Sequence, residues 1–331
     1  MKKNIFMILL VLALAMVMAA CGAGNSSEPA ATETEEVASD SEETQEPAAE
    51  EPTELTIKHQ LGETVVPVNP ENVVVFDYGV LDSLDLLGVE VAAVAQGSSI
   101  PTYLSKYEDS KYVNAGSLKE PDFEAISALE PGLIIISGRQ QDAYEELSKI
   151  APTIFMGVDT ARYMESYKEN ATILGQIFDK KTEVETELAK VEKTIAALNE
   201  KATATGKNAL VVLANAGNIS AYGPGSRFGL IHDVFGLEAV DENLEVSTHG
   251  QNISFEYIVE KDPDYLFVVD RDAVVGGDAS AAQTIENDLV KNTKAYKNGN
   301  IVYLNPEFWY LSGGGLISVP EMVKQVEEGI Q

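Results

Sequence analysis

One local pattern occurs twice in this chain. Phe123-Glu124-Ala125-Ile126 is followed by Pro131, an apolar run and Arg139, and Phe255-Glu256-Tyr257-Ile258 is followed by Pro263, an apolar run and Arg271. The Phe, Glu, Ile, Pro and Arg positions all recur 132 residues apart. The repeat predicts two similar lobes, each with a strand that leads to an arginine. Two such lobes facing each other direct two cations into one cleft, which suits an anionic ligand.

The first residues have the pattern of a secretion signal. Lys2 and Lys3 precede an apolar run at 5–17, and small residues then lead to Cys21, the single cysteine of the chain. The run is too short for a typical membrane-spanning helix, so we interpret residues 1–20 as a signal peptide. The small residues before Cys21 resemble the lipobox of bacterial lipoproteins, although Met18 stands where leucine is commoner. This resemblance implies lipidation of Cys21 and a location on the extracytoplasmic face of the cell membrane.

Residues 21–54 are expected to form an acidic, disordered tether. The stretch after Cys21 contains eleven Asp or Glu and no Lys or Arg. Such a sequence cannot bury a core, and repulsion between like charges keeps it extended. An alternative is that the acidic stretch binds cations.

Charge and cysteine content exclude several classes of function. The formal net charge is −30 at pH 7, and outside the first 54 residues 42 acidic residues still face 21 basic ones. A body this acidic argues against nucleic-acid binding. The part of the chain after Cys21 has no cysteine, which rules out disulfides, thiol catalysis and thiolate metal sites there.

The rest of the chain predicts an α/β fold with mostly parallel sheets, because buried apolar strands alternate with helices. We expect an N-terminal lobe at 55–162, a connecting helical region at 163–205 and a C-terminal lobe at 206–331. An apolar stripe in the connecting region favours one long, rigid helix between the lobes, with the ligand cleft between them. A surface helix of one lobe would fit the same stripe, and a break near Asp179 is compatible with either interpretation. Other expected elements are a hairpin at 55–68, strands at 73–76, 133–136, 209–213 and 266–269, and helices at 123–129, 227–235 and 318–329.

Candidate ligand residues follow from the rule that ligands bind beyond the carboxyl ends of strands in α/β sheets. Each candidate alone has a plain structural explanation: an arginine in a surface ion pair, a histidine in a solvated loop, or an aromatic residue at the edge of the core. Taken together, they include three of the four arginines and the sole tryptophan. The set comprises Arg139, Arg227, Arg271, His249, Trp309 and Tyr310.

These features resemble the lipid-anchored substrate-binding proteins of iron-siderophore ABC importers, which are class III periplasmic binding proteins. The similarity runs from about Leu55 to the C-terminus and is strongest to members that bind catecholate complexes such as petrobactin. It is carried by Ser226-Arg227-Phe228-Gly229, His249-Gly250, Trp309-Tyr310-Leu311 and the Phe-Glu-x-Ile repeat.

The resemblance implies a role for each candidate. Arg139, Arg227 and Arg271 would hold the catecholate oxygens, and His249 and Tyr310 would ligate ferric iron when a tetradentate siderophore leaves two positions open. Glu124 and Glu256 would dock onto arginines of the permease, although a glutamate near a helix start also favours the helix dipole. The ferric siderophore is then the transported ligand, no intrinsic cofactor is expected, and the receptor is expected to be a monomer.

Other functions stay open at this point. The same scaffold could bind heme, cobalamin or a hydroxamate siderophore, but a neutral hydroxamate complex does not need three arginines. A bare Zn²⁺ or Mn²⁺ site is disfavoured, because His59, His232 and His249 lack metal-ligand spacing. A surface hydrolase or lyase could use His249 and Tyr310 as acid and base, but common catalytic motifs are absent from the sequence. We therefore do not expect an enzyme.

Overall fold

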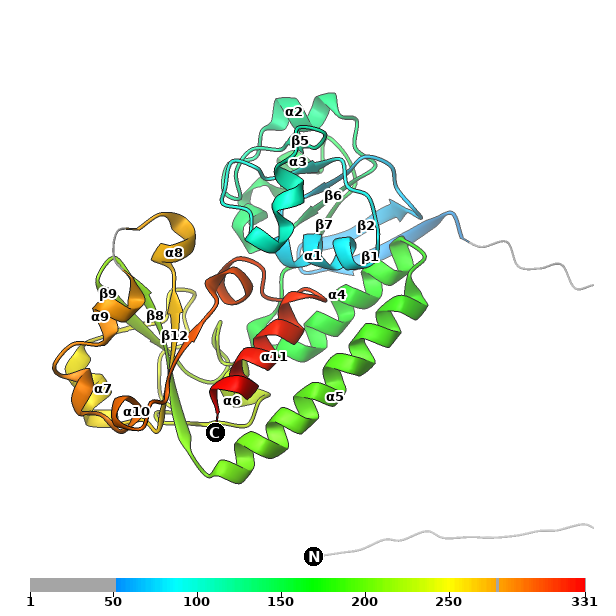
Figure 1. Ribbon diagram of the computed structural model, residues 1–331. Helices are drawn as coiled ribbons and strands as arrows, with labels where there is room; N and C mark the ends of the chain where they lie inside the picture. The colour runs from blue at the N-terminus through cyan, green and yellow to red at the C-terminus, as the bar shows by residue number, and fades with distance from the viewer. Residues whose placement is uncertain (1–51, 278–279, 331) are drawn as a thin grey trace, which may run out of the picture. The chain divides into compact units, whose positions relative to one another are not determined.

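The computed structural model describes residues 52–277 and 280–330 (Figure 1). The predicted signal peptide, Cys21 and nearly all of the predicted tether lie outside the described residues. The described part begins with β1 (Glu54–His59) and β2 (Gly62–Pro67), which pair antiparallel. This confirms the predicted hairpin. Ile57 and Val66 are its buried residues, and Thr64 Oγ1 donates a hydrogen bond to the Thr153 carbonyl of the neighbouring sheet (2.9 Å).

The N-terminal lobe is built on a five-stranded parallel sheet in the order β5-β4-β3-β6-β7. Every residue of β3 and β6 is buried, as expected for strands of a parallel sheet covered on both faces. The strands are β3 (Val73–Val75), β4 (Ala93–Val94), β5 (Val113–Asn114), β6 (Leu133–Ile136) and β7 (Thr153–Phe155). The helical segments are α1 (Tyr78–Leu86), η1 (Thr102–Glu108), α2 (Phe123–Ala128), η2 (Gly138–Ala143) and α3 (Tyr144–Leu147).

Two helices connect the lobes. A short turn, η3 (Thr160–Arg162), leads into α4 (Tyr163–Ile177), and α5 (Lys181–Thr205) follows. The chain breaks between them at Asp179, whose φ of 52° lies in the left-handed region. Figure 1 shows α4 and α5 lying side by side, and they are in contact. The long connecting helix is thus α5, and the predicted stripe is buried at Val184, Val191, Ile195 and Leu198.

The C-terminal lobe has a mixed sheet in the order β11-β9-β8-β12-β13, with β10 also paired to β8. β9 runs antiparallel to both β8 and β11, so this sheet is less parallel than the sequence suggested. The reason is local: Ala216 and Gly217 both have positive φ and close a two-residue hairpin. The strands are β8 (Asn208–Asn215), β9 (Asn218–Tyr222), β10 (Glu238–Ala239), β11 (Gln251–Ile253), β12 (Tyr265–Asp270) and β13 (Ile301–Leu304).

Short helices surround this sheet. They are α6 (Leu230–Asp233), α7 (Phe255–Lys261), α8 (Asp272–Val275), α9 (Ala281–Ile285), η4 (Val290–Asn292), α10 (Lys294–Lys297) and η5 (Glu307–Leu311), followed by α11 (Ser318–Gly329). The prediction for α11 is confirmed, and it packs on α5. The prediction of a helix at 227–235 is wrong: only α6 forms, because residues 223–229 make a tight turn around Gly225 (φ 70°).

Each lobe has its own apolar core, and the core of the C-terminal lobe also includes residues of α4 and α5. No helix in the described part of the chain is both long and apolar enough to cross a membrane.

Candidate functional site

A cavity of about 1040 Å³ is lined by both lobes. Its walls include the loops after β6 and β12, the end of β8, β9, the loop before β11 and η5. All six predicted ligand residues line this one cavity: Arg139, Arg227, His249, Arg271, Trp309 and Tyr310. The strand-end rule therefore selected residues that the fold brings together around one cavity.

Arg139 and Arg271 hold equivalent places in the two lobes. Arg139 lies in η2, three residues beyond the end of β6. Ser137, the capping residue of η2, forms reciprocal hydrogen bonds with Gln140. Arg271 directly follows β12, and its backbone N–H donates to the Ala214 carbonyl (3.1 Å). Its guanidinium also donates to Asn215 Oδ1 at the end of β8. Arg271 is thus fixed by the end of the neighbouring strand β8, whereas Arg139 is positioned by the capped start of η2.

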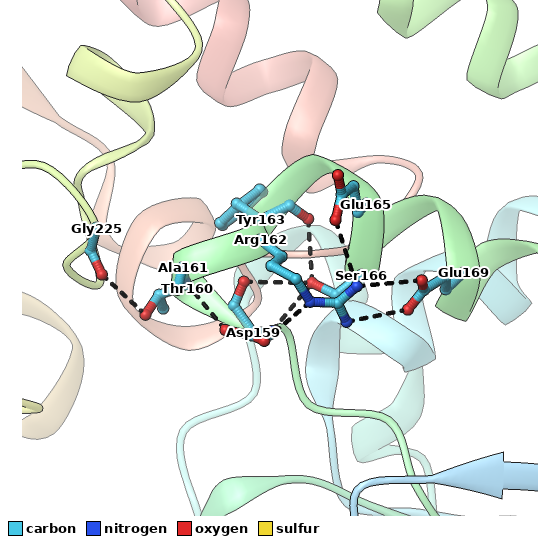
Figure 2. Close-up of polar contacts among 9 residues, drawn as sticks. All are labelled: Asp159, Thr160, Ala161, Arg162, Tyr163, Glu165, Ser166, Glu169 and Gly225. Atoms are coloured by element: carbon cyan, nitrogen blue, oxygen red, sulfur yellow. Dashed lines mark hydrogen bonds and ion pairs between the residues drawn. The ribbon is translucent and has the colours of Figure 1, made fainter. Parts of the chain in front are cut away.

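Arg227 reaches the cavity from the tight turn rather than from a helix. Asp233 Oδ2 accepts the Gly225 N–H (2.7 Å), and the Thr160 hydroxyl donates to the Gly225 carbonyl (3.3 Å; Figure 2). The turn is therefore held both by α6 and by the start of the connecting helices. Burial, and then the charge of Arg139, lower the pKa of the Arg227 guanidinium. A bound anion would relieve both effects.

The three arginines converge on Tyr310. Its carbonyl oxygen accepts from Arg139 Nη2 (3.0 Å) and from Arg227 Nη2 (2.6 Å). Its phenol oxygen accepts from Arg271 Nε (2.8 Å), and the Arg227 guanidinium lies 4.2 Å from the ring centroid. One residue thus gathers three like charges, and these contacts orient the guanidiniums in the unliganded cavity.

The arginines also change the acidity of the Tyr310 phenol. Burial raises its pKa, but the hydrogen bond from Arg271 and the charges of Arg227, Arg271 and Arg139 together lower it below the usual value. A phenol with a lowered pKa gives up its proton more readily, and the phenolate is the form that binds ferric iron.

His249 lies at the cavity wall in the exposed loop before β11. Its imidazole makes no hydrogen bond or ion pair with the residues that the structure describes. Gly250, the next residue, has a φ of 70°, and a methyl group there would lie 2.7 Å from the ring of Tyr222. The His-Gly pair therefore needs its glycine for a sterically strict turn, and the histidine stays open to the cavity.

Trp309 is mainly a core residue. Its side chain is only 3% exposed, its Nε1–H donates to Gln325 Oε1 of α11 (3.2 Å), and its ring meets Phe228 edge to face. The indole thus supports the cavity wall from behind, and the core-edge interpretation of Trp309 holds for most of its surface.

Several further residues of the cavity were not selected from the sequence. Lys119 supplies a fourth cation, and its ammonium group pairs with no acid among the described residues. A neutral polar wall is formed by Asn215, Asn218, Ser220, Ser247, Thr248 and Asn252. Asn215 ends β8, so the strand-end rule that selected the arginines could have found it.

Arg162, the remaining arginine, does not line the cavity. It is exposed and donates to Asp159, Glu165 and Glu169 at 3.3–3.4 Å, as Figure 2 shows. It is thus in a surface ion-pair network, the expected environment for an arginine without a ligand role.

The predicted docking glutamates occupy the second position of α2 and of α7, and both are exposed. Asp122 caps α2 by accepting the Ala125 N–H (3.0 Å), whereas the Ser254 side chain makes no capping bond to the backbone of α7. Hydrogen bonds from its own backbone N–H and from the Ser254 hydroxyl lower the pKa of the Glu256 carboxyl. Glu256 therefore does contribute to the start of its helix, which leaves the capping explanation open beside the docking one.

The histidines do not form a metal site. Among residues 52–277 and 280–330, no three His, Cys, Asp or Glu side chains gather closely enough to share a metal ion. His59 bonds to Thr64, and His232 bonds to the Leu237 carbonyl.

Two similar α/β lobes, joined by a long helix around a polar cavity, define a class of ligand-binding proteins. A model of the periplasmic binding protein family matches residues 73–308, and the chain belongs to this family.

Particular relatives narrow the comparison. The chain is 49% identical to the petrobactin-binding protein YclQ of Bacillus subtilis (strain 168) over 332 residues, 99% of each chain. The crystal structure of YclQ matches with a TM-score of 0.82 and 53% identity, covering 84% of this chain and 99% of that one. The periplasmic catecholate-siderophore binding protein VctP of Vibrio cholerae matches with a TM-score of 0.80 and 40% identity, covering 83% of this chain and 99% of VctP. These relatives are substrate-binding proteins, which decides against the enzyme hypothesis.

Proposed function

We propose that this protein is an extracytoplasmic receptor that binds an anionic ferric catecholate siderophore of the petrobactin type and delivers it to an ABC importer for iron uptake. One observation carries the proposal: three arginines from two lobes converge in a single cavity. The relatives named for petrobactin and for catecholate siderophores support the same ligand class.

Charge balance supports an anionic complex. Ferric iron with six catecholate oxygens has a net charge of about −3, which three guanidiniums neutralise. Each charge-assisted hydrogen bond contributes roughly 1.5–3 kcal/mol, so Arg139, Arg227 and Arg271 together contribute about 5–9 kcal/mol before ordering costs. This local attraction outweighs the long-range repulsion from the acidic body.

His249 and Tyr310 are proposed to complete the coordination of iron when a siderophore supplies only four oxygens. The imidazole has no hydrogen-bond or ion-pair partner among the described residues, and the phenol has a lowered pKa. Both side chains line the same cavity. Trp309 is proposed to support the ligand through its position behind Tyr310.

The proposed delivery step involves two further parts of the chain. Cys21 would anchor the receptor to the membrane by its lipid, and some relatives carry the name lipoprotein. Glu124 and Glu256, one per lobe, would dock onto cationic residues of the permease. A monomer would suit this arrangement, because each lobe has one of the two proposed docking glutamates. Heme, cobalamin and hydroxamate siderophores are the alternative ligands, and a neutral hydroxamate complex predicts weaker dependence on the arginines.

A fluorescence titration tests the proposal. The purified protein would be titrated with ferric petrobactin or a ferric tris-catecholate, and in parallel with a neutral ferric hydroxamate, while Trp309 emission is recorded. Saturable quenching by the catecholates alone supports the proposal. Quenching by the hydroxamate alone keeps the fold and refutes the role of the arginines, and no quenching by either directs the search to heme and cobalamin.

A further inference from the structure

A buried carboxylate of the N-terminal lobe binds the first residues of α11, the helix near the C-terminus of the chain. Asp82, in α1, is fully buried. Its Oδ1 accepts the Ile317 N–H (3.2 Å), and its Oδ2 accepts the Ser318 N–H (3.0 Å). Ser318 is the first residue of α11. A carboxylate of one lobe thus satisfies the free N–H groups at the start of a helix that follows the last strand of the other.

The contact is closely fitted on both sides. A methyl group added at Gly315 would overlap Oδ1 of Asp82, and one added at Gly79 would lie 2.6 Å from the Ser312 carbonyl oxygen. Ser83 Oγ also accepts the Leu316 N–H (2.9 Å). The glycine-rich stretch before α11 is therefore what lets the backbone approach α1.

Hydrogen bonds lead from Asp82 to the turn that carries Tyr310. The Tyr103 hydroxyl lies 3.1 Å from Asp82 Oδ2 and 2.7 Å from Ser312 Oγ. Ser312 Oγ in turn donates to the Glu307 carbonyl (2.6 Å). Glu307 and Ser312 flank the turn in which Tyr310 lies.

A second N-terminal contact holds the same turn. The Thr102 backbone N–H and hydroxyl both donate to the Glu307 carboxylate (3.1 and 2.8 Å). Both ends of the turn are therefore fixed by residues of the N-terminal lobe, although the chain enters the turn from β13 of the C-terminal lobe.

We infer that Asp82 is a positioning residue of the ligand site, which holds the Tyr310 carbonyl where the two lobes' arginines meet. Asp82 does not line the cavity, so it acts through the segment from Glu307 to Ser318. The inference rests on the proposed function only in that the affinity measured is the affinity for the proposed ligand. If the contact between Asp82 and the start of α11 served stability alone, its loss would leave the ligand affinity of the folded protein unchanged.

The surroundings of Asp82 provide a second readout. Burial raises its pKa to about 7, although hydrogen bonds from Ser318, Ile317 and Tyr103 oppose the shift. The titratable groups that face it are the phenols of Tyr103 in η1 and of Tyr163 and Tyr167 in α4. Burial, and then the charge of Asp82, raise the pKa of all three phenols. Asp77, at the start of its own helix, adds a second negative charge near Tyr163. No cation of the described residues is among the groups that shift the pKa of Asp82.

The experiment compares Asp82→Asn with a matched control, Asp85→Asn. Asp85 lies on the same helix, accepts from the Tyr107 hydroxyl (3.0 Å) and pairs with Lys106, so all its partners belong to the N-terminal lobe. We expect Asp82→Asn to weaken binding of a ferric tris-catecholate about tenfold, the effect of about 1.4 kcal/mol. It should also shift the Trp309 emission of the unliganded protein, because Trp309 lies in the same turn. Asp85→Asn should change neither.

The pH dependence separates positioning from stability. Above about pH 7 Asp82 is a carboxylate that accepts the helix N–H groups, and below it the wild type approaches the neutral asparagine variant. The ratio of wild-type to Asp82→Asn affinity should therefore rise about fivefold from about pH 6 to about pH 8. Taking the ratio cancels the protonation of the ligand itself.

A folded Asp82→Asn protein that has wild-type affinity at about pH 8, with only a lower melting temperature, would overturn the inference. If this variant does not fold, Tyr103→Phe decides. It cuts the link to Ser312 but keeps Asp82, and wild-type affinity in it refutes the inference. If the wild type itself does not bind the tris-catecholate but binds another ferric complex, the proposed function fails. The affinities of the same variants for that other complex then test the inference.

Discussion

The two lobes start from the same repeat but use it differently. In the N-terminal lobe the repeat feeds a parallel sheet, and Arg139 donates to the backbone carbonyl of Tyr310. In the C-terminal lobe it feeds a mixed sheet, and Arg271 donates to the Tyr310 phenol and to Asn215. Equivalent arginines therefore have different partners.

The two lobes also contribute unequally to the lining of the cavity. The C-terminal lobe provides Arg227, Arg271, His249 and the neutral polar wall, whereas the N-terminal lobe provides Arg139 and Lys119. We therefore expect the proposed ligand to make most of its directed contacts with the C-terminal lobe. The N-terminal lobe contributes charge and, through Asp82, holds the turn between them.

The largest effect, a loss of iron uptake, is expected when the proposed docking glutamates of both lobes are replaced together. Glu124→Ala combined with Glu256→Ala should leave binding unchanged and reduce iron uptake to the level of cells without the protein, because each lobe then lacks its docking carboxylate. Uptake of radiolabelled ferric siderophore measures this. Normal uptake in the double variant would leave helix capping as the only role of these residues.

Substitutions of the arginines test directly whether the two lobes contribute unequally to binding. Arg227→Ala should weaken binding of a ferric tris-catecholate about 10- to 150-fold, the range of one lost charge-assisted hydrogen bond. Arg139→Ala should cost less, because Lys119 in the same lobe still faces the cavity. Arg162→Ala, whose partners are all on the surface, is the control and should bind normally. An equal loss for Arg162→Ala and Arg227→Ala would refute the assignment.

The proposed iron ligands predict a difference between ligands. His249→Ala and Tyr310→Phe should weaken tetradentate ferric complexes about tenfold, or about 1.4 kcal/mol, and hexadentate ones much less. The physical reason is that only a tetradentate siderophore leaves iron positions for protein donors. The loss of the phenolate-to-iron absorption band in Tyr310→Phe measures the same contact. Similar losses for both kinds of complex would contradict direct ligation.

The smallest expected effects are on the pH dependence of stability. They come from one aspartate in each lobe, and the two pKa shifts have opposite signs. The raised pKa of Asp82, about 7, means that the folded protein holds this proton more tightly than the unfolded chain. Its contribution to stability is therefore complete at low pH and is lost as the pH rises from about 4 through about 7. We expect Asp82→Asn to flatten this part of the dependence of melting temperature on pH. An unchanged pH dependence would show that Asp82 does not titrate there.

Asp241 of the C-terminal lobe is the counterpart. Hydrogen bonds from Lys261, from the Asn243 N–H and from Tyr257 lower its pKa to about 2. Its contribution is present above about pH 4 and is lost as the pH falls toward 2, so Asp241→Asn should flatten only the acid limb. A change in the limb above pH 4 would show that the two groups are not independent.

Much of this arrangement is readable from the sequence because its signals are local. The buried runs of β3, β6, β8 and β12 and the arginines that follow two of them need only the strand-end rule. The partners of the arginines could not be predicted, because a backbone carbonyl carries no sequence signal. Asp82 could not be recognised either: it appears as an ordinary acid in a helix, and its partners Ile317 and Ser318 lie more than 230 residues away. The turn at Arg227 depends on contacts of Gly225 with Asp233 and Thr160, which are tertiary.

The carbonyl of Tyr310 has a consequence for how such a cleft can change over generations. Two guanidiniums are held by an atom of the main chain, which every residue type at that position would still supply. The side chain at position 310 can therefore be exchanged without releasing Arg139 and Arg227. A related protein could therefore have a different metal donor at this position, or none, and still hold the same two arginines in place for a different anion.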